Sequence, residues 1–162
     1  MVHYSDTHLV SASDTTCTEA DTWYPMQGDK LLHANSGDWS LASDNRLEHH
    51  HRDEVYRCFL SVALESDVLT NVEVAVGHFR KGASGVVILD DIKTLSTAAA
   101  GIILNASVSG VIEFSDPPIS QLELYIRSSV AGAVITVHTL AFDMFGLKNT
   151  DTPFEGLSKW RP

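Results

Sequence analysis

Between residues 55 and 145 the sequence alternates apolar and polar residues in a series of short runs. In the clearest run, every second position is apolar: Tyr56, Cys58, Leu60, Val62 and Leu64. The same spacing returns in residues 72–78 and 121–128. Because successive side chains of a β-strand point to opposite faces of the sheet, each run predicts a strand with one packed face.

The segments between these runs are rich in glycine, asparagine, aspartate and proline, which favour turns. Many short alternating strands separated by turns predict an all-β fold, an antiparallel jelly-roll sandwich. We place this domain at residues 22–145. Residues 1–21 are rich in Ser, Thr and Asp and are predicted to form an extended N-terminal arm, and residues 146–162 a polar C-terminal tail.

The bulk properties exclude several classes of protein. The chain has 162 residues, of which 44% are hydrophobic, enough for one domain with its own core. A net charge of −10 repels phosphate backbones, so we expect no nucleic-acid partner. No apolar run is long enough to span a membrane, and the N-terminus lacks the features of a signal peptide, so we expect no membrane partner. Cys17 and Cys58 do not form a disulfide framework, and Cys58 is expected to be a buried thiol.

One cluster of histidines suggests a metal. His49, His51 and Glu54 resemble the first half of the cupin motif, in which histidines and a glutamate hold a metal inside a jelly roll. His138 is a candidate for the later histidine, but its neighbours lack the motif's glycine-proline turn. Adjacent polar residues beside a turn are more often exposed, so we expect no metal and no cofactor. The sequence also contains no nucleophile motif and no phosphate-binding glycine loop, so we expect no catalytic residues and no enzyme activity.

Three large aromatic residues occupy the strand positions opposite the packed faces: Phe59, Phe79 and Tyr125. An exposed patch of such side chains normally marks an interface, so we predict that they form a contact between subunits. The alternative is that both faces of these strands are buried within one domain.

Two pairs of segments resemble strands of a known group of proteins. Residues 56–64 and 72–82 resemble the central strands of phage jelly-roll domains with a C1q/TNF-like build, and residues 121–129 and 133–142 resemble their closing strands. The resemblance covers residues 22–145. One departure is Ile119-Ser120, which stands where this group usually has a Gly-Asp turn.

This resemblance implies a sandwich that assembles as a homotrimer. In phages, such domains serve as capsid cement proteins, head fibres or parts of tails, and fold alone does not choose among them. We favour a capsid cement, or decoration, protein on the outer surface of the virion head, bound to the major capsid protein. Its arm and tail are expected to make the capsid contacts through isolated anchors: Leu9, Phe154 and Trp160.

Two other functions stay open. A head-fibre or tail receptor-binding domain would use the same trimer to bind a molecule on the host surface. The sequence has no heptad run or repeat of the kind expected in a fibre shaft. A cupin-type metal enzyme is the third candidate.

Overall fold

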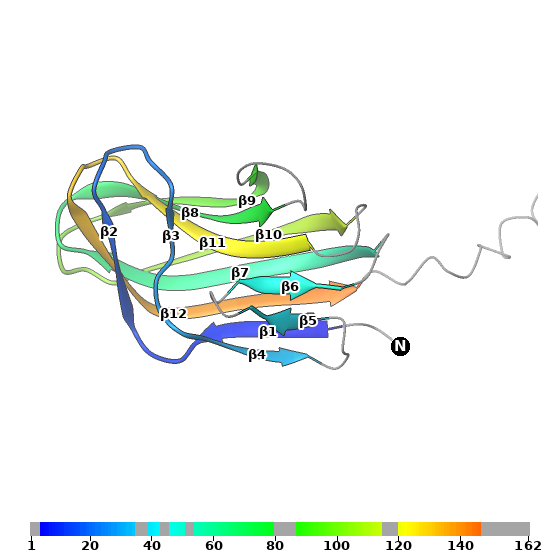
Figure 1. Cartoon of the computed structure of the whole chain (residues 1–162). Coiled ribbons are helices and arrows are strands. Elements are labelled where there is room, and N and C mark those ends of the chain that lie inside the picture. Colours follow the sequence, from blue (N-terminus) through cyan, green and yellow to red (C-terminus); the bar gives the residue numbers. More distant parts are fainter. Residues whose placement is uncertain are drawn as a thin grey trace, which may run out of the picture.

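The computed structural model describes residues 4–34, 39–42, 46–50, 54–79, 87–114 and 120–146. The described residues contain no helix, and therefore none that could span a membrane. They form a series of β-strands (Figure 1): β1 (Tyr4–Leu9), β2 (Ser13–Cys17), β3 (Tyr24–Pro25), β4 (Lys30–Ala34), β5 (Trp39–Leu41), β6 (Leu47–His49), β7 (Glu54–Ser66), β8 (Thr70–Phe79), β9 (Val87–Ala98), β10 (Leu104–Phe114), β11 (Ser120–Ser128) and β12 (Ala133–Gly146).

These strands form two antiparallel sheets that pack face to face. Sheet A has the order β10-β7-β12-β1-β4, and β2 also pairs with β12. Sheet B has the order β5-β6-β11-β8-β9, and β3 also pairs with β11. The predicted all-β antiparallel sandwich is therefore confirmed.

The alternation seen in the sequence places the core between the sheets. All five apolar side chains of β7 that the sequence assigns to the packed face are at most 1% exposed: Tyr56, Cys58, Leu60, Val62 and Leu64. They pack in one cluster with inward residues of β8, β11 and β12. Both cysteines are buried free thiols, and burial raises the pKa of Cys58 to about 12, so this thiol stays protonated and unreactive.

The prediction of a free N-terminal arm is wrong. β1 lies inside sheet A, paired with β12 on one side and β4 on the other, and β2 extends the same edge of β12. Ser5, Thr7 and Thr15 are buried although their segment looks too polar for a core. The reason is that β12 has backbone donors and acceptors to satisfy along its whole length, and small or β-branched hydroxyl residues fit a pleated sheet.

A turn after Met26 also ties the N-terminal segment to the domain. Val10 N donates a hydrogen bond to Asp29 O at 3.0 Å. Gly28 has a φ of 102°, and a Cβ placed there would lie 2.6 Å from Ser13 Cβ. Only glycine therefore fits where this turn passes β2. At the other end of the chain, β12 ends at Gly146, and the predicted tail contacts Phe154 and Trp160 lie outside the described residues.

We predict that deleting residues 1–20 abolishes cooperative folding, because the deletion removes β1 and β2 and uncovers one whole edge of β12. Thermal denaturation followed by circular dichroism would measure the effect. Deletion of residues 150–162 is the matched truncation and should leave the melting transition in place. A sharp transition near the wild-type temperature after the N-terminal deletion would contradict the role given to β1.

Candidate functional site

The outward face of sheet A carries an ordered array of side chains. Because β10, β7, β12, β1 and β4 pair in register, their outward residues line up in rows across the sheet. The first row is Val111, Arg57, Phe145 and Tyr4. The second row is Ser109, Phe59, Asp143, Asp6 and His33. The third row is Ser107, Ser61, Ala141, His8 and Leu31.

Aromatic side chains gather in the first two rows. Phe59 is 42% exposed and Phe145 is 38% exposed, and their rings meet edge to face with centroids 6.0 Å apart. The Tyr4 ring lies 5.5 Å from that of Phe145. We call Tyr4, Phe59 and Phe145 the aromatic face. Of the described large hydrophobic residues that are exposed, every one within a strand lies on this side of sheet A: Leu31, Phe59, Val111 and Phe145.

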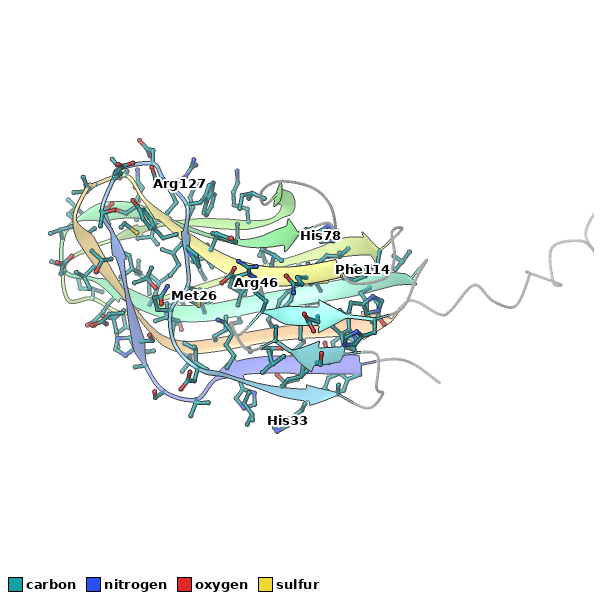
Figure 2. All side chains as sticks on the ribbon, viewed as in Figure 1. Met26, His33, Arg46, His78, Phe114 and Arg127 are labelled. Atoms are coloured by element: carbon teal, nitrogen blue, oxygen red, sulfur yellow. The ribbon has the colours of Figure 1, made fainter. Side chains whose placement is uncertain are left out.

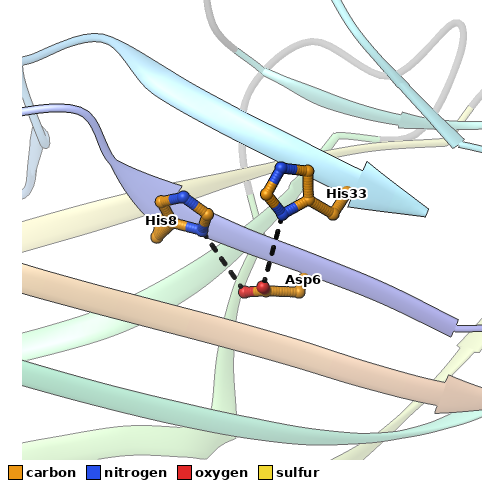
Figure 3. A group of neighbouring side chains, drawn as sticks. All are labelled: Asp6, His8 and His33. Atoms are coloured by element: carbon orange, nitrogen blue, oxygen red, sulfur yellow. Dashed lines mark ion pairs between the residues drawn. The ribbon is translucent and has the colours of Figure 1, made fainter.

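An acidic and histidine-containing group adjoins the aromatic face (Figure 3). His8 Nδ1 lies 3.6 Å from Asp6 Oδ1, and His33 Nδ1 lies 3.8 Å from Asp6 Oδ2. Asp143 stands opposite Asp6 on β12. Burial raises the pKa of Asp143, and so does the negative charge of Asp6, because two neighbouring carboxylates repel each other when both are ionised. This edge of the face therefore attracts positive charge.

The outward face of sheet B, in contrast, is closed by paired charges. Arg46 Nε donates to Glu123 Oε2 at 3.0 Å, and Arg127 forms an ion pair with Glu73. Both arginines can be followed in Figure 2. The Arg127 guanidinium also lies 4.8 Å from the centre of the Trp23 ring, a cation–π contact. Long side chains and the segment before β3 thus cover the part of this face that β11 forms.

This cover corrects the prediction for Tyr125, which is only 5% exposed. Its hydroxyl donates to Glu123 Oε2 at 3.4 Å, so the ring is held within its own domain. The alternative of two buried faces therefore holds for β11, whereas Phe59 is exposed as predicted. Phe79 pairs with Gln121 through its backbone, and its side chain lies outside the described part of the chain.

Leu9 does not fit its predicted role as a free capsid anchor. It is partly buried and packs against the core from the end of β1. The reason is the one that made the arm prediction wrong. Leu9 belongs to a strand paired within sheet A, so its side chain has core residues to pack against.

The histidines of the cupin-like pattern that the structure describes, His49 and His138, lie in different sheets. His49 is fully buried, stacked on Phe114 with ring centroids 4.4 Å apart, and its Nε2 lies 3.2 Å from the Tyr56 hydroxyl. His50 is exposed and its Nε2 lies 2.8 Å from Ser40 Oγ. His138 belongs to sheet A and pairs with Glu65 at 3.3 Å. His51 and the Glu54 side chain lie outside the described residues.

Another exposed apolar surface lies at one end of the sandwich. The turns that join β7 to β8, β9 to β10 and β11 to β12 meet there (Figure 1). Gly101 N donates to Ser66 O at 2.9 Å, and Asp67 N donates to Val134 O at 3.2 Å. We call this the loop tip, and its exposed apolar residues are Leu69, Ile102, Ile103 and Val130.

Most of the residues on the outward face of sheet A were not predicted from the sequence. Tyr4, Asp6 and His8 alternate with Ser5 and Thr7, so a period of two was present in the segment taken for an arm. The inner positions hold hydroxyl residues instead of apolar ones, which hid the pattern. Nothing in the sequence connects His33 with Asp6, since their pairing across β1 and β4 is set by the fold.

Comparison with known proteins identifies the type of jelly roll. No family model matches the chain, and no curated protein does. Among solved structures, murine APRIL at pH 5.0 aligns with a TM-score of 0.58 and 14% identity, over 87% of this chain and 98% of that one. The Eiger TNF from S. frugiperda aligns with a TM-score of 0.58 and 10% identity, over 93% of this chain and 96% of that one. The chain therefore has a TNF-like jelly-roll fold.

We predict that His49→Gln lowers the free energy of unfolding by roughly 1–3 kcal/mol, because it removes an aromatic ring packed between Trp39 and Phe114 and leaves an amide in that site. His50→Gln is the matched control and should change stability by less than about 0.5 kcal/mol, because this side chain is exposed. Urea denaturation of both variants measures the difference. Equal stability of the two variants would show that the His49 ring does not stabilise the core.

Proposed function

We propose that this chain is a structural protein that assembles as a homotrimer and decorates the outside of a phage capsid as a cement protein. The observation that supports self-assembly most directly is the aromatic face. Exposed rings in the middle of a paired sheet are costly to leave in water, whereas a neighbouring subunit removes them from it. The TNF-like fold agrees with the C1q/TNF-like build noted in the sequence, which implies three subunits.

Sheet A is the better candidate for the subunit contact because the sheet B face already has internal partners. Arg46, Glu73, Glu123 and Arg127 pair with one another on sheet B, and a partner would have to break those pairs or bury them. On sheet A, the rings of Phe59 and Phe145 need no such exchange. Self-association through one patch also agrees with the closed symmetry that most soluble oligomers adopt.

A cement function requires that the assembled trimer keeps an exposed surface for the major capsid protein. We assign that contact to the loop tip, where four aliphatic side chains lie exposed at one end of the sandwich. A trimer that packs through the faces of sheet A leaves its loop tips uncovered. The C-terminal tail with Phe154 and Trp160 is the other proposed contact. Repetition over a shell multiplies the small contribution of each contact.

The activity proposed is mechanical, and no catalytic step is required. A cement trimer adds buried area between neighbouring capsid subunits, and that area must be exposed again before the shell opens. A head-fibre or tail receptor-binding domain is the second use of the same trimer. The copy number in purified virions separates the two, since a cement protein covers the whole shell and a fibre or tail protein is present in few copies.

We predict that the isolated protein has about three times the 17.7 kDa mass of one chain in light scattering. Phe59→Glu should raise the dissociation constant of the assembly by about 100-fold or more, because it places an unpaired charge in an apolar contact. Leu69→Glu changes a residue that is 68% exposed at the loop tip and should leave the mass unchanged. A wild-type chain that stays monomeric at micromolar concentration would refute the trimer.

The loop tip can be tested separately as the surface that attaches to the capsid. Leu69→Asp combined with Ile102→Asp should give a protein that still forms the trimer but no longer sediments with bare capsids, because both charges fall on the loop tip. Deletion of residues 150–162 tests the tail in the same assay. If only the tail deletion loses binding, the loop tip is not the capsid contact. If both proteins bind like the wild type, both assignments are wrong.

A further inference from the structure

We propose that Asp6, His8 and His33 bind a divalent transition-metal ion, best matched by zinc, on the outward face of sheet A. Each residue offers one ligand atom, and the three atoms all lie within 4.8 Å of one another. Figure 3 shows both imidazoles directed toward the same carboxylate, one to each of its oxygens. This inference uses residues of a single chain and does not rest on the proposed function.

The distances fit a metal better than they fit direct hydrogen bonds. Zinc bonds to nitrogen and oxygen are about 2.0–2.2 Å long, so neighbouring ligands of a tetrahedral ion lie roughly 3.4 Å apart. Every pair of the three ligand atoms lies within 4.8 Å, so side-chain rotations can bring them to that spacing. The two nitrogen–oxygen distances are 3.6 Å, to Asp6 Oδ1, and 3.8 Å, to Asp6 Oδ2. Both are longer than the usual N–H···O separation, so hydrogen bonds between Asp6 and these rings do not explain the arrangement.

The backbone holds the three residues in place. Asp6 and His8 are two positions apart on β1 and therefore point to the same face. His33 lies on the neighbouring strand β4, directly opposite Asp6. β1 is fixed on both sides, by β12 and by β4. Ligands on paired strands lose little freedom when an ion binds, which favours affinity.

The electrostatic surroundings favour a cation. Asp143 lies beside Asp6 in the same row, and a divalent ion would offset the repulsion between the two carboxylates. The chemistry of the donors narrows the choice of ion. Two imidazole nitrogens suit zinc, copper or nickel, whereas calcium and magnesium prefer oxygen ligands alone.

The same sheet provides a matched control. His138 and Glu65 form a histidine–carboxylate pair at 3.3 Å, partly exposed like Asp6 and His8 and also on sheet A. That pair has one imidazole, and no third ligand joins it among the described residues. If one exposed histidine beside a carboxylate were enough to bind zinc, the His138–Glu65 pair would bind it as well as the Asp6 group. Our proposal requires that only the group with two imidazoles does.

Isothermal titration of zinc chloride into the full, untagged chain, stripped with a chelator, tests the site. We expect one zinc per chain. Loss of a residue that contacts a metal ligand, but not the metal, typically weakens binding by roughly 10- to 100-fold. We expect Asp143→Asn to weaken zinc binding within that range. His33→Gln and Asp6→Asn each remove a ligand and should weaken it by more. His138→Gln should leave the affinity unchanged.

A second readout is independent of affinity. Cobalt(II) added in place of zinc should give the visible absorption bands of a nitrogen- and oxygen-ligated ion, and His33→Gln should abolish those bands while the melting temperature without metal stays at the wild-type value. His33 is an exposed residue of an edge strand, so this variant is expected to fold. A wild-type chain that takes up no zinc would overturn the proposal. So would binding that survives in the His8→Gln, His33→Gln double variant.

Discussion

The register of β12 is the constraint on which the rest of the structure depends. β12 lies at the centre of sheet A. β7 pairs with one edge of β12, and β1 and β2 pair with successive parts of the other edge. Its residues Asp143 and Phe145 stand between Phe59 on β7 and the outward residues of β1. A shift of one residue in the pairing of β1 would turn Asp6 and His8 into the core and Ser5 and Thr7 outward. The aromatic face and the Asp6 group therefore exist only in this register.

A β-bulge within β12 makes this arrangement possible. The register with β7 shifts between Val137 and Thr139. Before the shift the buried residues are odd-numbered, such as Ile135, and after it they are even-numbered, such as Phe142 and Met144. An unbroken alternation would have placed Phe145 in the core. The extra residue thus directs this ring to the surface and lets one long strand serve both ends of the sandwich.

The sequence predicts the sandwich because the buried faces of its strands follow from alternation within each strand. The predictions that are wrong concern residues whose surroundings depend on pairing between distant segments. The buried faces of β7 and β8 can be read from alternation alone, since only the pleat matters. Tyr125 also occupies an outward position as expected, but Arg46 and Glu123 cover it, and a side chain from a distant segment leaves no trace in local periodicity. The same reasoning explains the histidines. His49 and His50 are adjacent in sequence and are separated by the pleat, whereas His8 and His33 meet across two paired strands.

The apolar and charged parts of sheet A set different conditions for a neighbouring subunit. Phe59 and Phe145 lie on β7 and β12, and burying them releases free energy in proportion to the area covered. Asp143 lies on β12 beside Phe145, and Asp6 lies opposite it on β1. Burying two carboxylates without a counter-charge costs more than a few apolar contacts return. If a subunit packs on this face as proposed, contact over Phe59 and Phe145 is favoured and contact over Asp6 and Asp143 is disfavoured, unless a cation neutralises the pair. The proposed metal would then extend the area available for contact between subunits.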